Sequence, residues 1–300
     1  MQGLFANQDA IMNFGEAREI ILAQLKTRVG FELPERQADL LLSAVTGVPC
    51  PRLEFESESR ITDAQFDYIR RYLDRDRLIP VPLHIGYTEV CGIRILVNSD
   101  VLMPGTETER LIEVVGRFLC TLHSPIVFDV GTGSGVLGIT LAIQYQQAVI
   151  YATDVSQEAL NLAGLNIRQH KLHDRIHLLK GRWLEPFGTA SPCRSADILM
   201  SNPPYVSTEQ VQMLPAGFRE FAPRLAIDGG SQGLEGHRAI ISKAGAHIRA
   251  GGHLVLQCDT GQAEDICELV RACAAFEEPS LYNGTCGNPR IVVAKRKQLL

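Results

Sequence analysis

The amino-acid sequence predicts an α/β fold, in which helices cover both faces of a mostly parallel sheet, with a small helical domain before it. Two observations lead to this prediction. From about residue 108, short apolar segments alternate with longer amphipathic ones, whereas the first 80 residues show only the helical spacing of apolar side chains. Continuous apolar strands connected by helices are typical of a parallel sheet that is buried on both faces.

The segment from residue 9 to about residue 80 is expected to be helical. The apolar residues of Ala17–Leu25 share one helical face, and Pro34 suits the first turn of a second helix that should end at Gly47. A third helix is expected over Asp63–Asp74, because the Thr62 side chain can accept a hydrogen bond from an N–H group of its first turn.

A hairpin is expected before the α/β domain. The segments Ile85–Val90 and Ile93–Val97 are β-prone, and a Cys-Gly pair separates them. We therefore divide the chain into a helical domain over residues 1–80, a hairpin linker over 81–104 and an α/β domain over 105–300.

Six apolar runs of the α/β domain are expected to form buried strands: Ile126–Val130, Val149–Ala152, Ile176–Leu179, Ile198–Met200, Leu254–Gln257 and Ile291–Ala294. Five helices are expected to alternate with them: Thr108–Leu122, Gly135–Gln144, Gln157–Gln169, His237–His247 and Gln262–Ala274. Ligands of such folds bind outside the carboxyl ends of the strands, so chemistry is expected in the loops at those ends.

Three glycines, Gly131, Gly133 and Gly135, follow the first strand at alternate positions and lead directly into a helix. Glycine lets the backbone turn tightly and lets a ligand approach it closely, because no Cβ stands in the way. The G-x-G-x-G spacing differs from the G-x-G-x-x-G of dinucleotide-binding folds. Taken alone, the segment is equally compatible with a tight turn that binds nothing.

Asp154 ends the second strand, about twenty residues after the glycine turn. A carboxylate at this position can accept hydrogen bonds from both hydroxyls of an adenosine ribose. Such a ribose occurs in NAD and in S-adenosylmethionine, so Asp154 does not choose between them. Alternatively, Asp154 caps the helix that follows it.

The segment Asn202-Pro203-Pro204-Tyr205 follows the fourth expected strand. Two prolines fix the backbone and remove two N–H donors, so the polar groups of the loop are its carbonyl oxygens and the Asn202 side chain. Tyr205 adds a flat aromatic face. Acceptors beside an aromatic ring suit an NH₂ group on a conjugated system, and the alternative is a rigid loop that binds no ligand.

Together these residues resemble the class I S-adenosylmethionine-dependent methyltransferases, and more narrowly the release-factor glutamine methyltransferases of the HemK/PrmC type. Further matches to that family extend over nearly the whole chain: Arg75–Pro80 with Ile85-Gly86, Met103–Glu109, and Phe221–Ala226 with Gly229-Gly230 and Gly233-Leu234. The resemblance implies a Rossmann-like, seven-stranded, mostly parallel sheet and an N-terminal helical domain that recognises the substrate. It also implies methylation of the side-chain amide nitrogen of a glutamine in a protein such as a release factor.

The resemblance assigns the cofactor S-adenosylmethionine to a defined set of residues. These are Gly131, Thr132, Gly133, Ser134, Gly135, Asp154, Trp183 and Asn202. The glycine turn would enclose the methionine end of the cofactor, and Asp154 would hold its ribose. Trp183 would lie near the adenine, with a core tryptophan as the alternative.

The resemblance also implies a catalytic role for Asn202, Pro203 and Tyr205, with Pro204 completing the substrate-binding loop. The Asn202 side chain and the Pro203 carbonyl would accept the N–H groups of the substrate amide, and Tyr205 would pack against it. Because the methyl donor is a positively charged sulfonium, we expect neither a general base nor a metal ion.

Four positions depart from the family pattern: Gly105, Thr106, Ala222 and Arg182. Gly105 replaces an arginine, Ala222 replaces a glutamate, and both lie in segments that border the substrate side of the family. The departures therefore leave the cofactor chemistry intact but weaken the assignment of the acceptor. Glu107 and Glu109 match the acidic end of a family signature, with helix capping by Glu109 as the alternative.

Three other interpretations compete with a protein substrate. The missing side chains at Gly105 and Ala222 favour a small-molecule amine or amide as acceptor. The N-P-P-Y sequence is shared with adenine-N6 methyltransferases, but a net charge of −5 argues against nucleic acid as a partner. A methyltransferase fold that serves only for binding would not require an intact glycine turn and Asp154.

The eight cysteines form no C-x-x-C pair and no zinc-ligand pattern with histidine, so free thiols in a reducing compartment are expected. No stretch approaches the ~20 apolar residues of a membrane helix, and Met1–Phe5 lacks the features of a signal peptide. The sequence thus predicts a cytoplasmic enzyme without a membrane anchor, and it specifies no oligomeric state.

Overall fold

The computed structural model describes residues 12–27, 33–75, 79–189, 193 and 195–298. These residues form two compact units. The first contains the described residues up to Gly86 together with Pro215–Phe221, and the second contains Tyr87–Leu214 and the chain from Ala222 onward. Residues 9–11 of the expected helical segment and positions 76–78 of the Arg75–Pro80 match lie outside the described residues.

The first unit is helical. Its helices are α1 Phe14–Lys26, α2 Pro34–Thr46, α3 Asp63–Leu73, α4 Val81–Ile85 and α10 Ala216–Phe221, with 3-10 turns at Cys50–Arg52 and Glu54–Glu56. The expected ends are confirmed, because Pro34 begins α2, Gly47 ends it with a φ of 77°, and the Thr62 side chain caps α3. Ile85 belongs to α4 and not to the expected strand, since Pro82 favours a first helical turn there.

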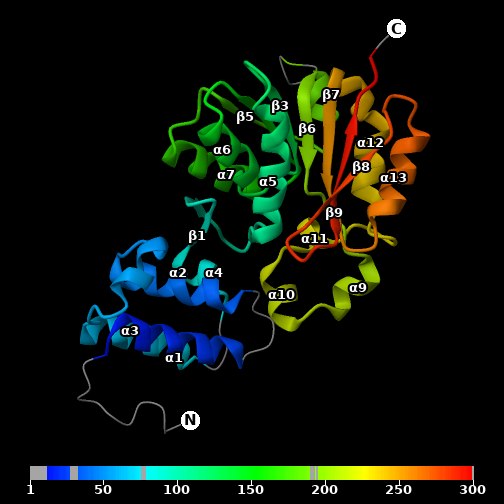
Figure 1. The fold of residues 1–300 in the computed structure, drawn as a ribbon. Helices are drawn as coiled ribbons and strands as arrows, with labels where there is room; N and C mark the ends of the chain where they lie inside the picture. Colours follow the sequence, from blue (N-terminus) through cyan, green and yellow to red (C-terminus); the bar gives the residue numbers. More distant parts are fainter. Residues whose placement is uncertain (1–11, 28–32, 76–78, 190–192, 194, 299–300) are drawn as a thin grey trace. The chain divides into compact units, whose positions relative to one another are not determined.

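The second unit is an α/β domain with a hairpin at its start (Figure 1). The hairpin consists of β1 Tyr87–Val90 and β2 Ile93–Leu96. The large sheet consists of β3 Ile126–Val130, β4 Val149–Asp154, β5 Ile176–Lys180, β6 Ala196–Ser201, β7 Ile248–Gln257, β8 Ser280–Asn283 and β9 Pro289–Lys295. The helices are α5 Thr106–Leu119, α6 Val136–Gln144, α7 Gln157–Gln169, α8 Glu185–Thr189, α9 Thr208–Met213, α11 Arg224–Ile227, α12 Glu235–His247 and α13 Ala263–Ala272.

The seven strands of the large sheet follow the order β5-β4-β3-β6-β7-β9-β8. The first five are parallel, whereas β9 is antiparallel to both of its neighbours. This confirms the α/β class with a mostly parallel, Rossmann-like sheet, and all six expected strands are present. The seventh, β8, lies at the sheet edge and contains only exposed or half-buried residues, so it has no apolar run to predict it.

Helices cover both faces of this sheet (Figure 1). One hydrophobic core joins the sheet to α5, α6 and α7, and the other joins it to α8, α12 and α13. In the second core the rings of Phe128 and Phe187 stack with their centroids 3.8 Å apart. The strand order reverses between β3 and β6, so the carboxyl ends of β3, β4 and β6 flank the point where ligands of such sheets bind.

The start of α5 differs from the sequence prediction. The helix begins at Thr106, with Gly105 as its N-cap, and it ends at Leu119. The Gly105 N–H donates to the Thr108 hydroxyl at 3.3 Å, which is the capping interaction. The Glu109 carboxylate instead accepts the Cys91 N–H at 3.0 Å, so it supports the turn of the hairpin.

Asn166 of α7 connects the hairpin to the glycine turn. Its side chain is fully buried and accepts the Leu96 N–H at 2.8 Å. The same carboxamide donates to the Leu96 and Ser134 carbonyls at 3.0 and 2.9 Å. One side chain thus satisfies three backbone groups, and its hydrogen bond to the Ser134 carbonyl is fully buried.

We predict that Asn166→Ala lowers the free energy of unfolding by about 2–4 kcal/mol, because buried backbone groups lose their partners. Urea denaturation followed by circular dichroism would measure this change. Asn161→Ala is the matched control, since Asn161 lies on the same helix but is exposed, and it should cost less than about 0.5 kcal/mol. Equal losses in the two variants would contradict the assigned role of Asn166.

Candidate active site

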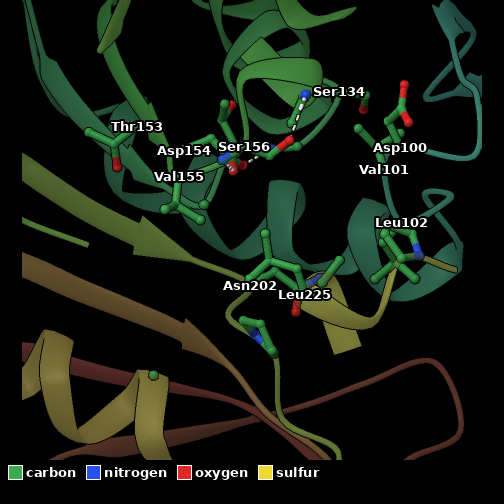
Figure 2. A pocket seen from close by; sticks show the side chains of 18 of the residues that line it. Asp100, Val101, Leu102, Ser134, Thr153, Asp154, Val155, Ser156, Asn202 and Leu225 are labelled. Carbon is green, nitrogen blue, oxygen red and sulfur yellow. Dashed lines mark hydrogen bonds between the residues drawn. The ribbon is translucent and has the colours of Figure 1, made fainter. Parts of the chain in front are cut away.

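A cavity of about 550 Å³ lies at the carboxyl ends of β3, β4 and β6. Figure 2 shows Thr153–Ser156 on one side of it, Asn202 and Leu225 on a second side, and Asp100–Leu102 on a third. Of the expected site residues, eight line the cavity: Gly131, Thr132, Gly133, Ser134, Asp154, Trp183, Asn202 and Pro204. Three others do not line it themselves but are adjacent in sequence to residues that do: Gly135, Pro203 and Tyr205.

The glycine turn adopts a conformation that requires its glycines. All three have positive φ angles, of 76°, 56° and 81°. The N–H groups of Gly131 and Thr132 both donate to the Thr153 carbonyl at 2.9 Å, which fixes the turn against β4. At Gly135 a Cβ would lie 3.3 Å from that of Ala163 on α7, so the turn also approaches this helix closely.

Ser134 places a polar group in the cavity without a partner. Its side chain is buried, and its hydroxyl has no hydrogen bond to any of the described residues. A buried hydroxyl without a partner costs about 1–3 kcal/mol. A polar group of a ligand bound against the turn would remove that cost.

The carboxylate of Asp154 is held between the glycine turn and α7. One oxygen accepts the Gly133 N–H and the other accepts the Ser156 N–H, both at 2.9 Å. The cap of α7 is Ser156, whose hydroxyl accepts the Ala159 N–H at 3.1 Å, so the capping alternative for Asp154 is wrong. Each carboxylate oxygen has a further lone pair that can accept a ligand hydroxyl.

Asp129 lies behind the glycine turn and is fully buried in β3. Burial raises the pKa of its carboxyl to about 7, while the hydrogen bond from the Thr132 hydroxyl at 2.6 Å opposes the rise and the charge of Asp154 adds to it. This carboxyl was not singled out from the sequence. In the sequence, Asp129 could have been noticed as an ionisable residue inside an apolar strand.

The N-P-P-Y segment is packed against a second glycine-rich loop. A Cβ on Gly229 would lie 2.5 Å from the Pro204 carbonyl oxygen, and a Cβ on Gly233 would overlap the Tyr205 carbonyl oxygen. Only glycine permits both approaches. From the start of α13, the Gln262 side-chain nitrogen donates to the same Tyr205 oxygen at 2.8 Å.

Asn202 presents an acceptor that no part of the described chain uses. Its side-chain oxygen is shielded from water and has no hydrogen-bond partner among the described residues. None of the described backbone N–H groups donates to the Pro203 carbonyl either. The Asn202 side chain thus offers the cavity a desolvated acceptor, and the Pro203 carbonyl follows it directly in the chain.

Trp183 serves both as a cavity wall and as part of the core. It adopts a left-handed φ of 52°, and its ring packs on the second core. A Cβ on Gly236 would lie 2.9 Å from the Trp183 ring and 3.0 Å from the Pro203 side chain. Gly236 therefore leaves room for both the ring and the Pro203 side chain. A left-handed backbone at a residue other than glycine often accompanies ligand sites.

The sequence motifs did not identify several residues that line the cavity, and some residues of the motifs lie outside the cavity. Asp100, Val155 and Glu235 line the cavity without belonging to any expected motif. Arg182 also lines it and is exposed, whereas Glu107 does not line it and accepts the Thr285 N–H at 3.0 Å. Proximity to the Met103–Glu109 match was the one sequence signal for Asp100.

Three further findings bear on the sequence expectations. Within the described ranges, no group of His, Cys, Asp and Glu side chains could hold a metal ion. No helix among the residues that the structure describes is long and apolar enough to cross a membrane. The following thiols are free: Cys120, Cys258, Cys267, Cys273 and Cys286.

Fold and cavity together define a class of protein. A family model described as "Methyltransferase small domain" matches residues 108–231. The crystal structure of the hMettl16 catalytic domain, in complex with the MAT2A 3′UTR hairpin 6, superposes with a TM-score of 0.53 at 17% identity, over 67% of this chain and 74% of that one. The second unit therefore has the fold of the class I methyltransferases, which use S-adenosylmethionine.

The relatives narrow this class to one family. The release factor glutamine methyltransferase of Moorella thermoacetica is 33% identical over 271 residues, which cover 90% of this chain and 94% of that protein. The protein of the same name from Gloeobacter violaceus is 30% identical over 277 residues, covering 92% and 94%. The chain belongs to the release factor glutamine methyltransferase family, as the sequence motifs indicate, and it is an S-adenosylmethionine-dependent methyltransferase.

We predict that Asp129 makes the ligand-free protein less stable as the pH rises from about 4 to about 7. In this window the unfolded chain releases the Asp129 proton at the ordinary pKa of about 3.9, whereas the folded protein retains it. Asp129→Asn should therefore gain stability relative to the native protein between pH 5 and pH 8, measured by urea denaturation. A difference that does not change with pH would contradict the burial of an ionisable group at this position.

Proposed function

We propose that this protein binds S-adenosylmethionine in the cavity and methylates the side-chain amide nitrogen of a glutamine in a release factor. The observation that carries the proposal is the unpartnered, water-shielded side-chain oxygen of Asn202 beside the cavity. The names of the relatives support a release factor as substrate. The expected cytoplasmic location of this protein would place it in the same compartment as the release factors that act in translation.

The cavity residues fit the proposed cofactor. The Ser134 hydroxyl, with no partner among the described residues, and the turn formed by Gly131, Gly133 and Gly135 suit the polar methionine end. Asp154 would accept hydrogen bonds from the ribose hydroxyls, and Trp183 would pack near the adenine. When bound, S-adenosylmethionine supplies a methyl group on a positively charged sulfur atom.

The N-P-P-Y segment fits a planar amide. The Asn202 oxygen and the Pro203 carbonyl would each accept one N–H of the amide, and the Tyr205 ring would pack on its plane. An alkyl amine has neither this planar shape nor two N–H bonds fixed in one plane, so the arrangement favours a carboxamide.

The same residues would act mainly by orientation. An amide nitrogen is a weak nucleophile because its lone pair is delocalised into the carbonyl group. With both N–H bonds held, the face of the nitrogen is directed toward the methyl donor, and orientation of this kind can supply roughly 7–11 kcal/mol of a barrier. The nitrogen gains the methyl group and afterwards loses one proton to water, so no side chain has to act as a base.

The first unit would supply recognition of the protein substrate, since the cavity is built entirely from the second unit. The position of the family arginine, Gly105, has open space around it, because a Cβ there would meet no atom within 4 Å. Losing that arginine therefore removes a possible contact to a partner without changing the local fold. This keeps a release factor compatible with the sequence departures.

We predict that labelled S-adenosylmethionine transfers its methyl group to a recombinant release factor. The label should disappear when the glutamine of its Gly-Gly-Gln motif is replaced by alanine, because the accepting nitrogen is then gone. Nucleic acid and cell metabolites, incubated separately, should stay unlabelled. Label on a metabolite but none on the release factor would refute the protein substrate, and failure of S-adenosylhomocysteine to bind in calorimetry would refute the enzyme class.

We predict that Asn202→Ala lowers turnover by about 100-fold or more, since it removes one of two acceptors that orient the amide. Calorimetry should find the affinity for S-adenosylhomocysteine changed by less than about threefold, because the glycine turn and Asp154 remain. Asn161→Ala, at an exposed position of α7, is the control and should leave both quantities unchanged. A large loss of cofactor affinity in Asn202→Ala would show that Asn202 acts mainly on the cofactor and contradict its proposed role as the acceptor for the substrate amide.

A further inference from the structure

Arg290 of β9 reaches the N-P-P-Y segment from a distant part of the sequence. One of its terminal nitrogens donates to the Tyr205 hydroxyl at 3.2 Å, and its guanidinium lies 5.4 Å from the centre of the Tyr205 ring. Tyr205 is thus held at both ends, because Gln262 fixes its carbonyl oxygen and Arg290 fixes its hydroxyl. Neither of these two residues belongs to a motif that the sequence analysis singled out.

Arg290 is itself held in place. Its other terminal nitrogen forms an ion pair with the Asp259 carboxylate at 2.5 Å, and the arginine side chain is only 15% exposed. The Asp259 backbone N–H donates in turn to the Gln262 side-chain oxygen at 3.0 Å. The three residues form one connected network, so the position of the Tyr205 hydroxyl is coupled to the loop before α13.

We infer that Arg290 is a positioning residue for the methyl transfer. Arg290 fixes the plane of the Tyr205 ring against the acceptor amide. The inference rests on the proposed function, because it assigns Tyr205 to the acceptor side. A tyrosine side chain has two rotatable bonds, and fixing its carbonyl leaves both of them free. A hydrogen bond to the hydroxyl removes that freedom at the far end of the ring.

The chemistry of arginine suits this task. Its planar fork can direct one nitrogen at Asp259 and the other at Tyr205, whereas the ammonium group of lysine offers a single compact charge. Since the Asp259 pair fixes the fork, the hydrogen bond to Tyr205 has a defined direction. Loss of the guanidinium would remove this hydrogen bond from the Tyr205 hydroxyl while the glycine turn and Asp154 stay unchanged.

We predict that Arg290→Met lowers kcat for release factor methylation by roughly ten- to a hundredfold, the usual effect of a misplaced reacting group. KM for the release factor and the affinity for S-adenosylhomocysteine should change by less than about twofold. Arg290→Lys should recover part of kcat, because an ammonium can still donate to the Tyr205 hydroxyl. Arg271→Met is the control, since Arg271 of α13 also pairs with carboxylates but contacts no part of the N-P-P-Y segment.

A double-mutant cycle with Tyr205→Phe separates positioning from a general structural role. Tyr205→Phe removes the hydroxyl that Arg290 holds, so adding Arg290→Met to it should lower kcat by less than about twofold. If Arg290→Met is as harmful in the Tyr205→Phe background as in the native protein, Arg290 does not act through Tyr205. That result would overturn the inference.

A second readout does not depend on the acceptor. With all seven tyrosines labelled at the ring carbon that bears the hydroxyl, Tyr205→Phe identifies the Tyr205 resonance in carbon NMR spectra. Arg290→Met should move or broaden that resonance, whereas Arg271→Met should not. If the release factor is not methylated at all, the proposed function fails, and the resonance still decides the placement of Tyr205. An unchanged resonance would overturn the inference.

Discussion

The close approach of two backbones is the constraint on which the rest of the active site depends. The carbonyl oxygens of Pro204 and Tyr205 occupy the space that side chains on Gly229 and Gly233 would need. Main chain packs on main chain here, so the loop has little freedom to shift. Asn202 therefore stands next to a tightly packed stretch of backbone.

Gly236 lies against both Trp183 and Pro203 of the N-P-P-Y segment. The Trp183 ring lines the cavity, and Gly236 leaves room for both this ring and the Pro203 side chain. The left-handed backbone of Trp183 is the local cost of placing a large ring there.

Most of the fold could be predicted from the sequence, as could those parts of the site whose residues are close together in the chain. Asn202 and the glycine turn were found because their chemistry lies within a few consecutive residues at strand ends. The edge strand β8 was missed because it buries no apolar run, and the short helices α9 and α11 are too brief to show a period. Gln262 and Arg290 were missed for a different reason. They meet Tyr205 only through folding, across 57 and 85 residues of sequence, and no spacing rule joins residues so far apart.

We propose that a preformed loop holds the acceptor amide through Asn202. A crystal structure of the protein with S-adenosylhomocysteine and a glutamine-containing peptide of a release factor tests it most directly. We expect an amide nitrogen at about 2.9 Å from the Asn202 side-chain oxygen. We also expect the N-P-P-Y backbone to move by less than about 1 Å from its position in the absence of ligands. A glutamine bound elsewhere, or a loop that has to rearrange to receive it, would contradict this proposal.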